Sequence, residues 1–176
     1  IPPGKTLPPL KMAIGELVYV LEGNGLSTVR DDVTGEEKSF EWGERALFHI
    51  PRHSIHQVSN ARGDRPARLL HYNYLPVAMS VVPDPDFFFN NPFQRSIAGD
   101  LESIFSDAKE IPNDDSMNTI RVFWSGNFFP DMGAWEKLAP YRGRGAGGSA
   151  VFMRFPNAEM SAHMSVFDPG LYKKGH

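Results

Sequence analysis

The sequence has 176 residues, 41% of them hydrophobic, which is enough for one domain with a sizeable core. Its net charge of -3 supplies no basic field for nucleic acid. The absence of cysteine excludes disulfides, zinc-thiolate sites and thiol nucleophiles. No apolar run approaches the ~20 residues that a membrane-spanning helix needs. We therefore expect a cytoplasmic protein that binds neither nucleic acid nor membranes.

The two ends of the sequence indicate a fragment. The first residue is not Met, and Ile1–Gly4 is typical of a turn inside a domain. The other end, Tyr172–His176, stops abruptly. We interpret the chain as part of a longer protein, so that any targeting signal would lie outside it.

The first half of the chain predicts closely spaced strands. The strongly apolar segment Glu16–Leu21 is too short and too β-branched for a helix. Glu22–Gly25 predicts a hairpin turn, because Asn-Gly supplies the positive φ that such turns need. Further strands are expected at residues 26–30, 38–42, 46–50, 56–59 and 68–75. Strands at this spacing, with turn signals between them, indicate a sandwich or a barrel.

The character of the chain changes after residue 75. Val81–Asp86 predicts a rigid connection, and Phe87–Phe89 is too aromatic for a free linker, so we expect it to pack on a barrel wall or a partner subunit. Residues 96–108 predict a short helix with apolar residues at helical spacing. Arg142–Gly148 predicts a flexible connector, and it lacks the Lys-Ser/Thr of a phosphate loop. Residues 120–135 return to an aromatic, strand-like sequence around 122–124 and 128–129, and two more strands are expected at residues 150–155 and 159–167.

The candidate functional residues centre on the stretch from Pro51 to Asn60. Pro51 ends the apolar run Ala46–Ile50 because it has no N–H for a strand ladder. His56 then lies on a new extended segment, and Asn60 opens a turn. A histidine held in this way can project into a barrel and bind a metal, but the same arrangement can also be plain core.

These residues resemble the two motifs of the cupins, which are small jelly-roll β-barrels. The first cupin motif ends in Glu, six residues and Gly, which Glu16 and Gly23 match. The second contains Pro, a Gly corner, His and, after three residues, Asn, which Pro51, His56 and Asn60 match. The resemblance implies an all-β fold built on a cupin jelly-roll barrel.

The wider layout resembles bacterial two-barrel cupins. In these, an aromatic connector and a Gly-rich stretch join the barrels, and Arg144–Gly148 and Pro169–His176 match such pieces. The resemblance implies an N-terminal barrel lacking its first strands over residues 1–80. A connector with a short helix would follow over residues 81–148, and the start of a second barrel over residues 149–176.

The resemblance also implies a metal. In cupins three His and one Glu bind Mn, Fe, Ni, Cu or Zn. The Glu ligand falls on Glu16 and the second-motif His on His56, but the paired histidines fall on Leu10 and Met12. We therefore expect a residual first-barrel site that binds no catalytic metal, since such a metal usually has three protein donors. His176 matches the first His of the second barrel's motif, which implies a divalent transition metal there.

Other histidines offer alternatives. The two remaining Gly positions of the second motif fall on Arg45 and His53, and we expect His53 to be a corner residue facing solvent. His49 and His71 lie on predicted strands. A single histidine on a strand is more often structural than a metal ligand. We therefore favour a structural role for His49 and His71 over a role as replacement ligands.

Two functional hypotheses follow from the resemblance. The first is a metal-dependent oxygenase, decarboxylase or isomerase that acts on a small organic molecule, with its catalytic residues unidentified. The second is a non-catalytic module that binds a small molecule or serves a structural role, which the loss of both paired histidines favours for this barrel. The exposed aromatic connector predicts a homodimer, because large apolar patches usually find partners.

Overall fold

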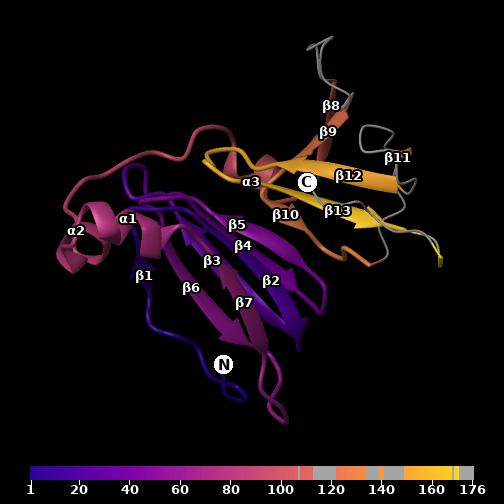
Figure 1. Cartoon of the computed structure of the whole chain (residues 1–176). Coiled ribbons are helices and arrows are strands. Elements are labelled where there is room, and N and C mark those ends of the chain that lie inside the picture. The colour runs from indigo at the N-terminus through magenta and orange to yellow at the C-terminus, as the bar shows by residue number, and fades with distance from the viewer. Residues whose placement is uncertain (107, 113–121, 134–138, 141–148, 168, 171–176) are drawn as a thin grey trace.

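The computed structural model describes residues 1–106, 108–112, 122–133, 139–140, 149–167 and 169–170. It is built mostly of β-strands with a few short helices (Figure 1). No helix in these described ranges is long and apolar enough to cross a membrane. The all-β class expected from the sequence is therefore confirmed.

Two four-stranded antiparallel sheets form the barrel, in the orders β1-β6-β3-β4 and β10-β5-β2-β7. Their strands are β1 (Leu10–Lys11), β2 (Glu16–Glu22), β3 (Gly25–Arg30), β4 (Glu37–Trp42), β5 (Leu47–Ile50), β6 (Ile55–Asn60), β7 (Arg68–Tyr72) and β10 (Phe128–Phe129). The consecutive strands β3 and β4 pair as a hairpin. From β4 to β7 the chain changes sheet at every connection. This alternation between two packed antiparallel sheets is the topology of a jelly roll.

The predicted hairpin at Glu22–Gly25 is wrong. Strand β2 belongs to one sheet and β3 to the other, so this turn carries the chain across the barrel. Gly23 supplies the positive φ of 96°. Gly25 pairs with both Trp42 and Asn60, which places it inside the second sheet rather than in a loop. The sequence correctly indicates a turn at these residues. No local pattern, however, shows whether the strand after the turn pairs with β2 or joins the other sheet.

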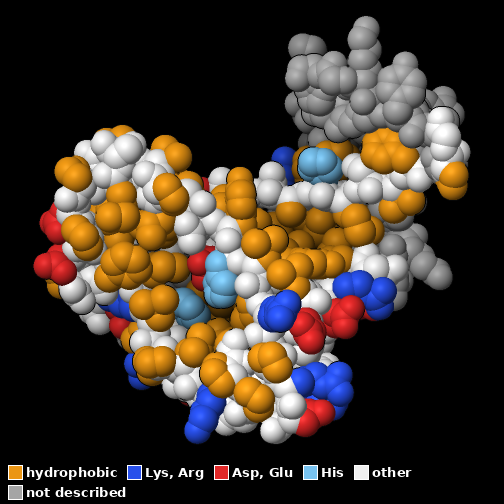
Figure 2. Space-filling model, turned by 60° about the horizontal axis from the view of Figure 1, so that its bottom comes forward, with side chains coloured by type: hydrophobic (Ala, Val, Ile, Leu, Met, Phe, Trp, Pro, Cys, Tyr) orange, Lys and Arg blue, Asp and Glu red, His pale blue; other side chains and the backbone are white. Residues whose placement is uncertain are grey.

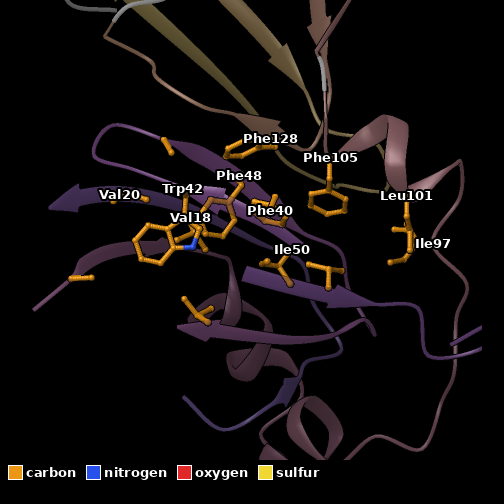
Figure 3. Packing of buried hydrophobic residues seen from close by; sticks show 14 residues of the cluster. Val18, Val20, Phe40, Trp42, Phe48, Ile50, Ile97, Leu101, Phe105 and Phe128 are labelled. Atoms are coloured by element: carbon orange, nitrogen blue, oxygen red, sulfur yellow. The ribbon is translucent and has the colours of Figure 1, made fainter. Parts of the chain in front are cut away.

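The space between the two sheets is filled by apolar side chains (Figure 3). Val18, Val20, Phe48 and Ile50 come from one sheet and meet Val29, Phe40, Trp42 and Val58 from the other. The ring of Phe40 lies 5.2 Å from that of Phe48 and 5.0 Å from that of Phe105, centroid to centroid. The core therefore extends beyond the barrel strands into the segment that follows them.

Three short helices lie in that segment: α1 (Leu75–Val81), α2 (Pro85–Phe89) and α3 (Leu101–Ile104). The predicted helix over residues 96–108 is thus limited to α3, which Asp100 begins by accepting a hydrogen bond from the Ser103 N–H. The helix is short because Leu101 and Phe105 are buried in the barrel core, which fixes the chain direction on both sides. The predicted rigid connection over residues 81–86 instead contains the start of α2.

A third sheet packs beside the barrel. Its strands are β8 (Lys109–Pro112), β9 (Val122–Ser125), β11 (Ala139–Pro140), β12 (Ser149–Arg154) and β13 (Ser161–Val166). It lies over the face of the β10-β5-β2-β7 sheet that points away from the core (Figure 1). Val151, Met153 and Phe155 cover Leu17 and Phe129 of that sheet. The expected strands near residues 150–155 and 159–167 are confirmed, whereas the domain division at residues 80 and 148 stays a prediction.

Replacing Gly25 with alanine is expected to lower the free energy of unfolding by about 1–3 kcal/mol, the usual range for overpacking. An added Cβ would overlap the backbone oxygen of Ser59 and the ring of Trp42. Urea unfolding measures the loss. Gly63→Ala is the matched control, since a Cβ there would meet nothing within 4 Å. Equal stability of the two variants would contradict this packing.

Candidate polar site in the barrel

The structure brings Glu16 and His56 to the same interior. Glu16 lies opposite Ile50 on β5, and His56 lies opposite Leu10 on β1 and Val29 on β3. Directly opposite residues on antiparallel strands share a face of the sheet, so Glu16 and His56 belong to the core side with the buried Ile50 and Val29, whereas Leu10 on the edge strand β1 is 39% exposed. Glu16 is 5% exposed and His56 is 6% exposed. The predicted pair is therefore buried together inside the barrel.

Glu16 is held by two side chains from the neighbouring edge of its sheet. Its Oε2 lies 2.8 Å from Nδ1 of His71 on β7, and its Oε1 accepts a hydrogen bond of 2.8 Å from the Asn73 amide. Burial alone would raise the pKa of Glu16, but the hydrogen bonds from His71 and Asn73 and the His71 charge outweigh it and lower the pKa. Glu16 is thus an anion with both oxygens engaged.

His56 faces this carboxylate without a hydrogen-bond partner on Nδ1, which is buried. Burial lowers the pKa of His56, the Glu16 charge opposes that shift, and His71 adds to it. The net effect is a neutral imidazole at neutral pH. Such a ring offers one donor and one acceptor to whatever lies next to it.

Two residues have a left-handed backbone conformation: Arg45 in the turn before β5, and His53 in the corner between β5 and β6. Arg45 has a φ of 69° and His53 a φ of 60°, at the two positions where the cupin motif has glycine. Non-glycine residues in this region cost on the order of 1–3 kcal/mol, so surrounding contacts must hold them. The His53 N–H donates to the Met12 carbonyl at 2.7 Å. The corner geometry of the motif is therefore kept without its glycines.

The expectation that His53 faces solvent is wrong. His53 is 8% exposed, and its ring packs edge-on against Phe93 with centroids 5.1 Å apart. Phe93 belongs to the segment between α2 and α3, which folds back over the corner. His53 and Phe93 are far apart in the sequence, so no local sequence pattern predicts that they are in contact.

Apolar side chains from α1 and α2 cover one end of the barrel. Met12, Ile14 and Phe88 are buried there, and residues of α1 pack against them. The packing of Phe88 confirms that the Phe87–Phe89 stretch contacts the barrel. The His71 side chain is 42% exposed, so the polar cluster reaches the surface at its edge. Figure 2 shows histidine and acidic side chains together in the middle of one face, flanked by hydrophobic side chains.

The residues of this cluster do not fit a metal ion. Leu10 offers no donor, Met12 offers a thioether buried among apolar groups, and the Glu16 oxygens are occupied. No group of three or more His, Cys, Asp or Glu side chains in the described residues could hold a metal. His176, the proposed ligand of a second barrel, lies outside the described residues.

His49 belongs to a different part of the molecule. It lies opposite Leu17, on the face of its sheet that points away from the core, and is 0% exposed. Burial lowers the pKa of His49 to about 4, with the nearby Asn127 opposing the shift. His49 is therefore a neutral buried histidine, and of the two alternatives His71 alone joins Glu16. Sequence reasoning missed Asn73 and Asn127, because both act through strands distant in sequence.

Comparisons with known proteins give structural neighbours only. No family model matches the sequence, and no curated protein matches it. Oxalate decarboxylase from Bacillus subtilis at pH 4.6 matches with a TM-score of 0.45 and 16% identity, over 86% of this chain and 42% of that chain. The structure used to assign that enzyme's Mn(II) centres matches with a TM-score of 0.43 and 14% identity, with the same coverage. This chain thus spans less than half the length of those proteins.

Replacing Asn73 with alanine is expected to lower the free energy of unfolding by about 1–3 kcal/mol, because one oxygen of the buried Glu16 loses its donor. Chemical denaturation at neutral pH measures the change. Asn91→Ala is the matched control: Asn91 makes the same two kinds of hydrogen bond, but its amide donates to the backbone carbonyl of Phe87. If both variants lose the same free energy of unfolding, the lost hydrogen bond to Glu16 is not the cause of the destabilisation.

Proposed function

We propose that this chain supplies a metal-free jelly-roll barrel to a two-barrel, cupin-type enzyme. The observation that carries the proposal is the state of Glu16: its oxygens bind His71 and Asn73, while positions 10 and 12 hold Leu and Met. A catalytic metal normally has three protein donors, and no group of His, Cys, Asp or Glu side chains in the described residues is arranged to supply them. The role of the barrel is then to build the fold and support the neighbouring sheet through the Leu17 and Phe129 contacts.

The metal chemistry of the proposed enzyme belongs to a second barrel, which the segment from residue 149 onward begins. His176 is its proposed first ligand, on the resemblance of Pro169–His176 to the opening of a cupin metal motif. A divalent Mn, Fe, Ni, Cu or Zn ion bound there would polarise a small organic substrate for oxygenase, decarboxylase or isomerase chemistry. The same proposal includes a homodimer. The large apolar side chains of Leu70, Tyr72 and Val77 are exposed, and such surfaces usually bind a partner.

The test is the metal content of the full-length protein and of two histidine variants, measured by elemental mass spectrometry. We expect His176→Ala to lose the metal and His56→Ala to retain it. A full-length protein that carries no stoichiometric transition metal, and gains none when supplied, would sink the enzyme proposal. Loss of metal from His56→Ala would show that the first barrel binds it.

A second candidate function, binding of a small polar molecule in the first barrel, is favoured by one observation. His56 presents a buried, unpaired Nδ1 beside the anionic Glu16, and His71 reaches the surface next to them. These groups suit an uncharged or cationic molecule with hydroxyl or amino groups. A thermal-shift screen with small polyols and amino alcohols tests it: His56→Phe should abolish any stabilisation, and His163→Phe, on exposed β13, should keep it.

A further inference from the structure

The contact between the barrel and the segment that follows it contains a pair of buried polar side chains that the proposed function does not use. Strand β10 pairs with β5 through Phe128 opposite Phe48. The His49 N–H donates to the Asn127 carbonyl at 2.8 Å, which extends this ladder by one position. His49 and Asn127 are therefore opposite each other, and their Cβ atoms lie about 5 Å apart on one face of the sheet.

Most of the surroundings of this pair are apolar, although a carboxylate oxygen of Glu159 lies near Gly15 at one side of His49. Leu17 and Phe129 lie on the same face of the sheet, and the ring of Phe155 covers His49 at 5.7 Å between centroids. Both His49 and Asn127 are 0% exposed. A polar group in such a place costs free energy unless it finds a hydrogen-bond partner.

Neither side chain has such a partner. Nδ1 and Nε2 of His49 and both amide atoms of Asn127 are buried and unpaired. The Asn127 amide lies near enough to act on the imidazole, but the two do not meet in hydrogen-bond geometry. Nε2 of His49 lies against Gly15, where a Cβ would come within 2.8 Å of it. Unpaired polar atoms thus lie on two opposite residues, and one of them, Nε2 of His49, lies against Gly15.

We propose that a water molecule is bound between His49 and Asn127 and is part of the folded protein. A buried water needs two to four polar partners, and this pair supplies both donors and acceptors. A neutral imidazole has one N–H and one free lone pair, and an amide has an oxygen and an NH₂ group. Water, which donates and accepts, can bond to one ring nitrogen of His49 and one amide atom of Asn127. A metal ion does not suit the site, because no group of three His, Asp or Glu side chains is present in the described residues.

The water also has a structural consequence. The same face of the sheet receives Val151, Met153 and Phe155, so the bridge lies inside the contact that joins the third sheet to the barrel. The buried face and the backbone ladder already specify the register of β10 against β5. A bound water would add a hydrogen-bonded bridge between the two strands at that same register.

The proposal is tested by NMR on the chain, through cross-relaxation between the Asn127 side-chain amide and water. We expect a cross-peak of the sign produced by a long-lived bound water. Asn60 is the matched internal control, because it is also buried, at 4% exposed, but its amide donates to the Ile1, Pro2 and Arg65 carbonyls. No such cross-peak is expected for Asn60. If the cross-peak to water is also absent for Asn127, the proposal is wrong.

A crystal structure at neutral pH provides the second measurement, and it is independent of any variant. The expected result is one density peak within hydrogen-bond distance of the His49 ring and the Asn127 amide. A direct contact between the two side chains with no peak would overturn the proposal, as would a peak with the anomalous signal of a metal. In Asn127→Leu, where it folds, the peak should be lost.

Discussion

Lowering the pH from 7 to 4 is expected to reduce the free energy of unfolding by about 3 kcal/mol through His49 alone. The folded protein holds the pKa of His49 at about 4, whereas the ordinary value is 6.5. The unfolded chain therefore takes up a proton first as the pH falls. The stability is complete above pH 6.5 and is lost progressively down to about pH 4. Burial in an apolar contact is the cause, because it disfavours the charged imidazolium.

The measurement is urea unfolding across this pH range, on the parent chain and on His49→Leu. The variant should show a weaker pH dependence. His53 and His56 also have lowered pKa values, so part of the dependence will persist in it. His163→Leu, on exposed β13, is the control and should follow the parent. Identical pH profiles for the parent and His49→Leu would contradict the buried, neutral state of His49.

The double substitution Leu10→His with Met12→His is expected to create a divalent metal site in the first barrel. Position 10 lies directly opposite His56, and Glu16 lies on β2 of the facing sheet. The two substitutions raise the donor set to three imidazoles and one carboxylate, which suits Mn, Fe or Zn. The metal must compete with His71 and Asn73 for Glu16, so adding Asn73→Ala should tighten binding further.

Calorimetric titration with Mn(II) measures this gain, and the expected result is binding of one equivalent. The control carries the same double substitution together with His56→Ala and should lose most of the affinity. A folded double variant that binds no metal would show that positions 10 and 12 do not face Glu16 and His56. Binding that survives His56→Ala would place the metal elsewhere.

The sequence predicted the part of the site that local patterns encode. The resemblance to the cupin motifs selected Glu16, and the proline corner at Pro51 placed His56 on the next strand. The glycine positions of the motif fell on Arg45 and His53, and the structure shows both in left-handed conformation. These features depend on neighbours within a few residues, which is the range over which spacing is informative.

The partners of Glu16 could not be predicted, because they depend on which strands pair. His71 and Asn73 reach Glu16 only because β7 lies beside β2, more than forty residues away in the chain. The burial of His53 and the shortness of α3 have the same origin, since both follow from packing of the segment between residues 87 and 105 onto the barrel. The hairpin predicted at Glu22–Gly25 failed for this reason too.

The claim that Glu16 is held by protein side chains rather than by a metal is tested most directly by anomalous diffraction from crystals grown with Mn(II). We predict no anomalous peak between Glu16 and His56, with Glu16 bonded to His71 and Asn73 as it is here. A manganese peak within coordination distance of the Glu16 carboxylate and the His56 ring would contradict the account.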